Sequence, residues 1–561
     1  MEIELAVAVA PHSLVPTKTR WFILASEHYP LGAIDFLPSA IGGLESTHQH
    51  QNNNSLVGLT EKSWRPGKLC LDFDTASLNR HETFPEEPYG ADARLVWHCR
   101  RAIDWLEHAS GDLLVKDGDP FELPDYRPSE ARRFLFQESP SEHVMWQASK
   151  ANSGTATLAV LDDQTRVIRD FADGKGTSIH QPTWGTAIAE LKHTELAIWV
   201  RTDQLIVLPP WQAPMTWGDL CSWFDQHQID LMRIVGHLSS SIRDGKSHLL
   251  LFGAPIPSTY GGPPEHFHWT AIQLPVLAQP GRRNKGYRDN PKSLAERDRS
   301  HHFRENAPVV WVESINAHTN DLTSRGALPQ KWTDAKILLI GAGSLGSAIA
   351  ELLVRAGVRD LTVCDCDTFE AGNLARHTLT LADVGESKAL ALRRRLHNVS
   401  PHSTVHAIAQ RFPPLKGSDD AHIAGVDIII DCSANNDVLF HLESTEFDRR
   451  PIAFSLSFGR DVKRLFVHGS RTGPIATTAF FSWIEPWLNL ERNEGSADAP
   501  LRPTTGCWHP AFPGRADHVW LFASQAVAWM DAYVESAEVD DHVVFLRSAT
   551  QGVARDEIPG G

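Results

Sequence analysis

The chain has 561 residues, of which 42% are hydrophobic and 22% charged, so it can bury several cores and is not globally disordered. Its 53 Lys and Arg against 69 Asp and Glu give a net charge of −16, which argues against a nucleic-acid or anionic-membrane binder. There is no long apolar run, no basic signal region and no CxxC pair among the seven cysteines. We therefore expect a cytoplasmic protein with no nucleic acid, membrane or structural zinc bound to it.

The first 125 residues form the first predicted domain, which is α+β. They contain short strands, a loop-rich centre with the polar segment 50–55, and one amphipathic helix over 91–109. Cys70 lies in RPGKLCLDFDT, between a Pro- and Gly-rich turn and a polar stretch that leads to the helix. A cysteine between two leucines is either a small core residue or an exposed nucleophile, and the local pattern leaves both interpretations open.

Residues 126–310 form a second predicted domain, also α+β. Strands are predicted in TATLAVL, ELAIWV, QLIVLP and HLLLFGAP, and a helix is predicted near 218–237. The segment 279–306 is polar, basic and poor in apolar residues, which is typical of a linker or mobile loop. No pattern in this domain points to chemistry beyond core packing.

Residues 311–561 form the third predicted domain, in which strands and helices alternate from about residue 336. KILLI is followed by a helix over 344–356 that ends at Gly357, and then come LTVCD, ESKALALRRRLHNV, TVHAIA and VDIIID. Such alternation with short loops predicts a parallel, doubly wound sheet. The fold class is therefore α/β, with a Rossmann-like C-terminal domain after two α+β domains.

A nucleotide site is predicted at the start of this sheet. Gly341, Gly343 and Gly346 form GxGxxG between the first strand and its helix, and Asp365 and Asp367 end the next strand. Glycines let backbone N–H groups and the positive helix end approach a phosphate, while an acidic side chain can accept ribose hydroxyls. The alternative is a tight glycine turn that only packs the helix on the sheet.

The residues after the acidic strand end separate two classes of nucleotide enzyme. Asn373, Arg376 and Lys388 are polar or cationic, and triphosphate chemistry uses such groups to offset charge on the leaving pyrophosphate. A dehydrogenase needs little here beyond the ribose carboxylate. Taken singly, each of the three would be interpreted as a solvated surface residue.

Taken together, GAGSLGS, DCDTFEAGNLARHTL and VGESKA resemble the ThiF/MoeB/ubiquitin-activating family of adenylating enzymes. The resemblance implies that ATP and Mg²⁺ are used to adenylate the C-terminal glycine of a ubiquitin-like protein. It also implies a homodimer, in which Arg325 would reach the active site of the other subunit. The implied nucleotide contacts are Asp365 with ribose and Asn373, Arg376 and Lys388 with phosphates.

The sequence departs from the family pattern at two places near this site. The later strand end runs from Asp431 to Asn435 as DCSAN, so Ala434 stands where the family has a second acid. We assign the Mg²⁺ to Asp431, with Asp437 as the alternative. His377 replaces the usual glutamine after Arg376.

Two cysteines are candidates for thioester chemistry, which needs an accessible thiol that is deprotonated as it attacks. Cys507, in PTTGCWHPAF, stands where activating enzymes of this family carry their catalytic cysteine, and His509 is two residues away. The alternative for Cys507 is a buried loop anchor. Cys70 lies in a GxxCLD pattern that resembles the signature of ubiquitin-conjugating enzymes.

The order of the parts resembles bacterial fused conjugating–activating enzymes of CBASS anti-phage operons. That resemblance implies adenylation of the C-terminal glycine of a ubiquitin-like protein or a cGAS/DncV-like nucleotidyltransferase, a thioester on Cys507, transthiolation to Cys70 and transfer to a lysine acceptor. Three alternatives remain: a sulfur-carrier adenylyltransferase, an NAD-dependent oxidoreductase, and a non-catalytic scaffold. The first explains only the last domain, and the second leaves the cationic residues unexplained.

Overall fold

The computed structural model describes residues 1–59, 62–71, 87–282, 284–324, 326–415, 417, 420–494, 514–548 and 552–557. The chain divides into two compact units, Met1–Pro182 with Lys192–His318 (unit 1) and Thr183–Leu191 with Thr319–Gly561 (unit 2). The candidates Cys507 and Arg325 lie outside the described residues. Within the described part, every helix is too short or too polar to cross a membrane.

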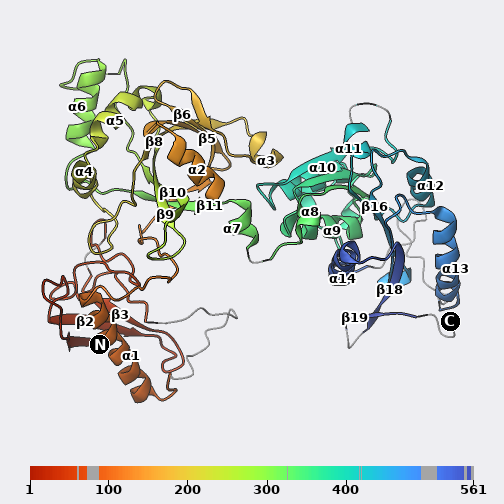
Figure 1. The fold of residues 1–561 in the computed structure, drawn as a ribbon, viewed down its shortest axis with the longest axis horizontal. Helices are drawn as coiled ribbons and strands as arrows, with labels where there is room; N and C mark the ends of the chain where they lie inside the picture. The colour runs from red at the N-terminus through yellow and green to blue at the C-terminus, as the bar shows by residue number, and fades with distance from the viewer. Residues whose placement is uncertain are drawn as a thin grey trace. The chain divides into compact units, whose positions relative to one another are not determined.

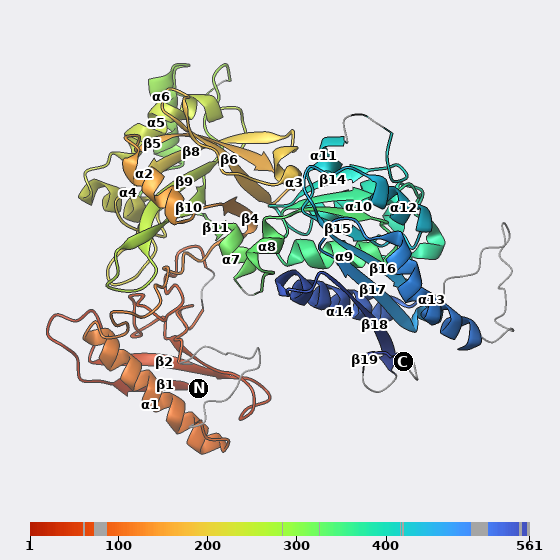
Figure 2. The ribbon, with the colours of Figure 1, turned by 45° about the vertical axis from the view of Figure 1, so that its right-hand side comes forward.

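Unit 1 begins with a three-stranded antiparallel sheet in the order β1-β2-β3. One helix, α1, lies across this sheet, as Figure 2 shows, and its buried side chains recur at positions 102, 105, 106 and 109, the spacing of one helix face. The predicted helix over 91–109 is thus confirmed. The bounds are β1 Glu2–Ala6, β2 Lys18–Ala25, β3 Ile34–Pro38 and α1 Ala91–Ser110.

The polar segment 50–55 is a loop, but it is packed inside the protein. Gln51, Asn53 and Asn54 are 5%, 1% and 0% exposed. The Asn53 side chain donates to the Asp125 carbonyl at 2.8 Å, and its backbone N–H donates to the Asp125 carboxylate at 2.8 Å. Asn54 Nδ2 donates to the Leu44 carbonyl at 2.7 Å. These hydrogen bonds offset the cost of burying the amides. The polar composition of the segment alone does not reveal that it is buried.

The rest of unit 1 is built on an eight-stranded mixed sheet, of which Figure 1 labels β5, β6, β8, β9, β10 and β11. The strand order is β4-β11-β10-β9-β8-β5-β6-β7, and β4 also pairs with β6 in parallel. Helices α4 and α5 pack their apolar side chains against β8, β9, β10 and β11. The strands are β4 Ser129–Phe136, β5 Ser153–Val160, β6 Thr165–Asp173, β7 Ser178–His180, β8 Thr194–Arg201, β9 Leu249–Pro257, β10 Pro264–Gln273 and β11 Trp311–Asn316. The helices are α2 Pro140–Ala148, α4 Trp217–Gln226, α5 Leu231–Leu238, the 3₁₀ turn η1 Ser239–Ile242, and α6 Pro291–His301.

Three sequence predictions for this region were wrong. QLIVLP is not a strand: Ile206 is buried in the core, but Pro209 and Pro210, which have no N–H for a ladder, follow at once. The helix predicted over 218–237 is two helices, because the Asp230 side chain caps a new one. The expected linker 279–306 contains α6, which begins after Asn290 as its N-cap.

The other face of this sheet carries an aromatic core around a buried acid. Trp146 and Trp269 both donate their indole N–H to Glu138 Oε1, at 2.8 and 2.7 Å. Trp199 packs against both of these rings. Burial raises the pKa of Glu138 to about 8. The many tryptophans of the chain therefore serve, in part, to build this core.

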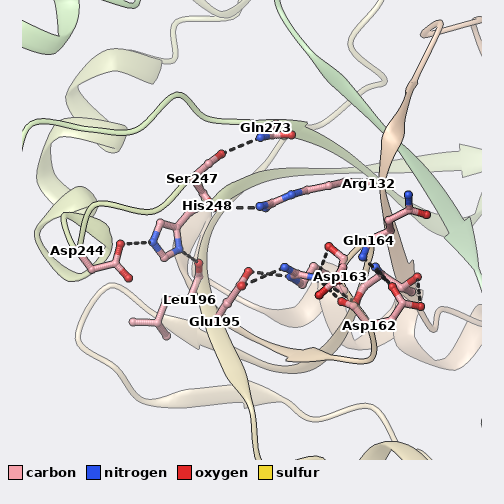
Figure 3. A network of polar contacts seen from close by, with 12 residues as sticks. Arg132, Asp162, Asp163, Gln164, Glu195, Leu196, Asp244, Ser247, His248 and Gln273 are labelled. Carbon is pink, nitrogen blue, oxygen red and sulfur yellow. Dashed lines mark hydrogen bonds and ion pairs between the residues drawn. The ribbon is translucent and has the colours of Figure 1, made fainter.

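A polar network ties several of these strands together (Figure 3). The Arg166 side chain is 5% exposed and pairs with Glu195 on β8 at 2.7 Å. His248 Nδ1 lies 2.7 Å from the Leu196 carbonyl on β8, and its Nε2 lies 2.8 Å from Asp244. Removing one partner of a buried pair such as Arg166–Glu195 costs about 3–5 kcal/mol. The network therefore joins β6 and the segment before β9 to β8 through side chains.

Unit 2 contains an eight-stranded sheet in the order β14-β13-β12-β15-β16-β17-β18-β19. Strands β14, β13, β12, β15 and β16 are parallel, as predicted, and the last three are antiparallel. The strands are β12 Lys336–Ile340, β13 Asp360–Cys364, β14 Thr404–Ile408, β15 Ile428–Asp431, β16 Ile452–Phe458, β17 Arg464–Ser470, β18 Asp540–Ser548 and β19 Gly552–Arg555. The four predicted strands KILLI, LTVCD, TVHAIA and VDIIID agree with β12, β13, β14 and β15 within two residues at each end, whereas β16 to β19 were not predicted.

Helices cover both faces of this sheet, as a doubly wound fold requires. Side chains at 337 and 339 of β12 face a core with α9, α10 and α14, whereas those at 338 and 340 face a core with α12 and α13. The helices are α7 Thr319–Thr323, α8 Gln330–Thr333, α9 Ser344–Arg355, α10 Lys388–His397, α11 Asp420–Ala424, α12 Asn436–Ser444, α13 Thr477–Glu494 and α14 Ala516–Glu535. Three 3₁₀ turns lie at η2 Ala371–Asn373, η3 Leu381–Asp383 and η4 Arg460–Val462.

A short segment of the predicted middle domain is part of unit 2. Helix α3 (Thr186–Ala189) and its flanks pack on α10 and β14. Gly185 N–H donates to the Pro401 carbonyl at 2.8 Å, and Thr186 Oγ1 lies 2.6 Å from His397 Nε2. A Cβ at Gly185 would lie 2.3 Å from the Ser403 carbonyl oxygen, so this close approach requires glycine. The proposed boundaries 1–125, 126–310 and 311–561 stay predictions.

Candidate functional site

The glycine-rich turn joins β12 to α9, and each of its glycines has a different role. Gly341 has φ +88, and a Cβ there would lie 2.7 Å from Ser433 N. A Cβ at Gly346 would lie 2.0 Å from the Gly341 carbonyl oxygen. Gly343, by contrast, has no atom within 4 Å of its would-be Cβ, and it begins α9 without a side-chain cap. The turn thus leaves open space in front of the positive end of α9.

The Asp365 carboxylate holds this turn by a hydrogen bond to its backbone. It accepts the Ala342 N–H at 2.6 Å and the Asp367 N–H at 2.7 Å. Burial raises the pKa of Asp365, although these donors and nearby Lys388 oppose the shift. The side chain is half-buried at the carboxyl end of β13, the position predicted for a ribose contact.

A pocket of about 240 Å³ opens in front of the turn. Strands β13 and β15 lie on opposite sides of β12, so the pocket lies at the point where the strand order reverses. It brings together the predicted phosphate contacts with the carboxyl ends of β12, β15 and β16. Its lining residues are Gly343, Ser344, Leu345, Asn373, Arg376, His377, Lys388, Cys432, Ala434, Leu456, Ser457 and Phe458.

The two cations of the pocket are held by their neighbours. Lys388, at the start of α10, is 12% exposed in its side chain and pairs with Asp367 at 2.9 Å. This hydrogen bond lowers the pKa of Asp367. Arg376 donates from Nη1 to the Gly372 carbonyl at 3.0 Å, and burial lowers its pKa. Asp367 therefore holds Lys388 in place in the wall of this pocket.

His377 supports the glycine turn from the opposite side to Asp365. The Leu379 N–H donates to its Nδ1 at 3.1 Å, so the ring proton is on Nε2, which donates to the Ala342 carbonyl at 2.7 Å. Burial lowers the pKa of His377 to about 4, so the ring is neutral at pH 7. The neutral imidazole of His377 thus donates one hydrogen bond and accepts another, as the amide of the usual glutamine can.

Asp431, the predicted magnesium ligand, faces the protein interior. It is 1% exposed, and its carboxylate accepts from Ser433 N at 2.9 Å, Ser433 Oγ at 2.6 Å and Ser455 Oγ at 3.1 Å. Burial raises its pKa. No group of three or more His, Cys, Asp or Glu in the described ranges could hold a metal. In this position the Asp431 carboxylate is not open to a metal ion, and its assignment to Mg²⁺ stays a prediction.

Cys70 lies in unit 1 beside a second pocket. Its neighbours Leu69 and Leu71 are buried while Cys70 is exposed, so it is not a core residue. Gln51 pairs with Leu69 in an antiparallel bridge, and the Cys70 N–H donates to the His50 carbonyl at 2.9 Å. The pocket, about 360 Å³, is lined by Cys70, Leu71, Arg101, Asp104, Trp105, His108, Leu113, Leu114, Lys116 and Asp119.

Sequence reasoning did not find all the residues around these sites. Leu456, Ser457 and Phe458 line the nucleotide pocket because β16 ends there, which only the strand order reveals. Glu122 contacts His50 next to Cys70, 72 residues away in sequence. The two flanking leucines left a buried Cys70 possible in the sequence, whereas in the structure they are buried and alternate with an exposed cysteine, as in a strand.

Comparison with known proteins identifies two regions of the chain. Residues 111–317 match the model of the Cap2 central linker domain, and residues 318–448 match the ThiF family. The chain is 30% identical over 531 residues to the ATP-dependent ubiquitin transferase-like protein Cap2 of Enterobacter hormaechei, covering 92% of this chain and 86% of that protein. It is 39% identical over 106 residues to the molybdopterin-synthase adenylyltransferase of Salmonella typhimurium, covering 18% and 41%. The crystal structure of E. coli MccB with succinimide superposes on 40% of this chain and 64% of its own, with 15% identity and a TM-score of 0.28.

The glycine turn yields a prediction that separates ligand binding from folding. Gly343→Ala places a methyl group in the open pocket, so we expect a normal melting temperature and ATP affinity reduced about tenfold. Gly346→Ala places it against backbone, so we expect destabilisation of ~1–3 kcal/mol. Calorimetric ATP titration and thermal unfolding of both variants measure this. Unchanged ATP affinity in Gly343→Ala would contradict the placement of phosphate at this turn.

Proposed function

The chain belongs to the Cap2 family of ATP-dependent ubiquitin transferase-like proteins, and from this premise we propose that it activates a protein C-terminal glycine with ATP and conjugates it to a lysine. Unit 2 would carry out the activation, and the N-terminal part of unit 1 the conjugation. The observation that carries the proposal is the convergence of Gly343, Asn373, Arg376 and Lys388 on one pocket at the switch point of the sheet.

The pocket suits a triphosphate better than a dinucleotide. In adenylation, the carboxylate oxygen of the glycine attacks the α-phosphorus, the bond to the bridging oxygen breaks, and pyrophosphate leaves. Arg376 and Lys388 would offset the negative charge that develops on pyrophosphate, and the N–H groups at the start of α9 would bind phosphate oxygens. Asp365 would hold the ribose. Mg²⁺ belongs to the proposal only as the usual companion of ATP, and no step here passes through it.

Two cysteines would carry the activated glycine onward. Cys507 would attack the adenylate and release AMP, and Cys70 would then take the acyl group by transthiolation. An acceptor lysine amine would finally displace Cys70 and form the isopeptide bond. Adenylate and thioester keep the acyl group activated, so that one difficult condensation becomes several easier steps. The support for Cys507 is its sequence context, and the support for Cys70 is its exposure beside a pocket.

The substrate is the least constrained part of the proposal. We propose a ubiquitin-like protein or a cGAS/DncV-like nucleotidyltransferase with a C-terminal glycine, a homodimeric enzyme that uses Arg325 across its interface, and a role in anti-phage defence. A sulfur-carrier adenylyltransferase is the second candidate, favoured by the 39% identity to molybdopterin-synthase adenylyltransferase. That match covers 18% of the chain, so this candidate leaves the whole of unit 1 without a purpose.

Adenylation predicts ATP–pyrophosphate exchange that depends on the C-terminal glycine. We expect Arg376→Ala to slow the exchange by about 100-fold or more, because one charge-stabilising donor contributes 10²–10³ in rate. Arg355→Ala is the matched control: Arg355 is 58% exposed on α9 and pairs only locally, with Glu351. Exchange at the wild-type rate in Arg376→Ala would remove Arg376 from the phosphate site.

The two-cysteine route predicts where the acyl group accumulates. With ATP and a C-terminal-glycine protein, Cys70→Ala should hold a dithiothreitol-sensitive adduct on Cys507 and form no conjugate. Cys507→Ala should keep pyrophosphate exchange but form no thioester. Non-reducing gels and peptide mass mapping measure both, with Cys99→Ala, a half-buried helix cysteine, as control. Normal conjugation by Cys70→Ala would refute the conjugating role of unit 1.

A further inference from the structure

We propose that His50 and Glu122 form a proton-accepting pair for the reactions at Cys70, and that the tip of the β9–β10 hairpin holds the pair in place. The inference rests on the proposed role of Cys70, and it gives the middle part of unit 1 a task in conjugation. The observation behind it is a series of contacts that runs from the hairpin through Glu122 to His50, whose carbonyl accepts the Cys70 N–H.

His50 lies directly opposite Cys70 across a short antiparallel bridge. The Cys70 N–H donates to the His50 carbonyl at 2.9 Å, and the Asn52 N–H donates to the Lys68 carbonyl at 3.0 Å. The pairing stops at His50, whose φ is +55 and whose own N–H turns to Glu122 instead. The turned backbone thus pairs the His50 main chain with Cys70 on one side and with the Glu122 carboxylate on the other.

Glu122 holds His50 by two contacts from one carboxylate oxygen. Oε2 accepts the His50 N–H at 3.0 Å and lies 3.3 Å from His50 Nδ1. A carboxylate at Nδ1 favours the tautomer with its proton there, which leaves Nε2 as the basic nitrogen. The side chains of His50 and Glu122 are 32% and 37% exposed, so a substrate can approach the pair.

The hairpin tip holds the segment that carries Glu122. Tyr260 N–H donates to the Asp119 carbonyl and Gly118 N–H to the Tyr260 carbonyl, both at 2.9 Å, and Phe121 N–H donates to the Ser258 carbonyl at 3.1 Å. The rings of Phe121 and Tyr260 pack with centroids 5.1 Å apart. Tyr260 and its neighbours therefore act as positioning residues for Glu122. They do so through backbone hydrogen bonds, which leave no pattern in the sequence.

Other charged groups surround His50 in the described part of unit 1. Asp119 and Lys116 line the Cys70 pocket on the same segment as Glu122. Lys68, on the facing strand, is paired with Asp35 at 2.6 Å. Asp125 is bound to Asn53. On α1, Arg101, Asp104 and His108 line the same pocket. Among these groups Glu122 contacts the imidazole directly, at 3.3 Å from Nδ1, so Glu122→Gln perturbs the pair at its point of contact.

The pair would move one proton in each reaction at Cys70. In transthiolation, the Cys70 thiol gives its proton to His50, the thiolate forms a bond to the thioester carbonyl carbon, and the donor thiolate leaves and takes the proton back. In conjugation, the lysine nitrogen bonds to the carbonyl carbon, its proton passes to His50, and Cys70 leaves as a thiolate. Atoms and charge balance in both reactions without any further reactant.

The test measures the ionisation of Cys70 directly, without the unidentified protein substrate. The full-length chain is alkylated with iodoacetamide from pH 5 to 9, and modification of Cys70 is followed by peptide mass mapping. Cys366, exposed in unit 2, is the reference thiol within the same chain. We expect the wild type to show reactivity at pH 6 about tenfold above that of His50→Asn, and Glu122→Gln to lie between them. Asparagine tolerates positive φ, so His50→Asn keeps the backbone, and its melting temperature checks folding.

A second arm uses a glycylglycine thioester of 2-mercaptoethanesulfonate as acyl donor. Acylation of Cys70 in the wild type, with a rate that falls about tenfold in His50→Asn while Cys366 alkylation stays unchanged, supports the pair. If Cys70 is acylated equally fast in His50→Asn and Glu122→Gln, with equal pH profiles, the pair is refuted while the role of Cys70 stands. If Cys70 accepts no acyl group in the wild type, the proposed function of unit 1 fails as well.

Discussion

The close backbone approach at the β12–α9 turn is the constraint on which the adenylating unit depends. Gly341 has a positive φ, and a Cβ there would also collide with the backbone of Cys432 and Ser433 just after β15, so both features require glycine. Gly346 lies against the Gly341 carbonyl. This packing aims the start of α9 at the space in front of Gly343. Asp365 and His377 then hold Ala342 from two sides, one through its N–H and the other through its carbonyl. Arg376 and Lys388 line the same pocket as this turn, so the turn determines which groups lie opposite them.

In unit 1, buried polar groups fix the loop that precedes the exposed Cys70. The loop before Cys70 is fixed by Asn53 and Asn54, whose amides reach Asp125 and Leu44. Thr47 and Gln212 join the same loop to the middle part of the unit. The Cap2 central linker domain, matched from residue 111, therefore supplies one side of the Cys70 environment and is not a mere spacer.

The sequence predicted the parts that local periodicity and backbone chemistry determine. The doubly wound strands, the α1 helix and the glycine turn follow from side-chain spacing and from positions where only glycine fits. Burial of Asn54, the two-helix break at Asp230 and the packing of Gly185 on unit 2 follow from distant partners, which no local window contains. Asp431 shows the same limit at the site, because its serine partners decide where the carboxylate points.

The central claim is that the pocket in unit 2 binds a nucleoside triphosphate, and isothermal titration of the full-length chain with ATP and with NAD⁺ tests it most directly. The arrangement of Arg376 and Lys388 in front of the glycine turn predicts saturable ATP binding and no NAD⁺ binding under the same conditions. Saturable NAD⁺ binding together with no heat from ATP would contradict the account and favour an NAD-dependent oxidoreductase.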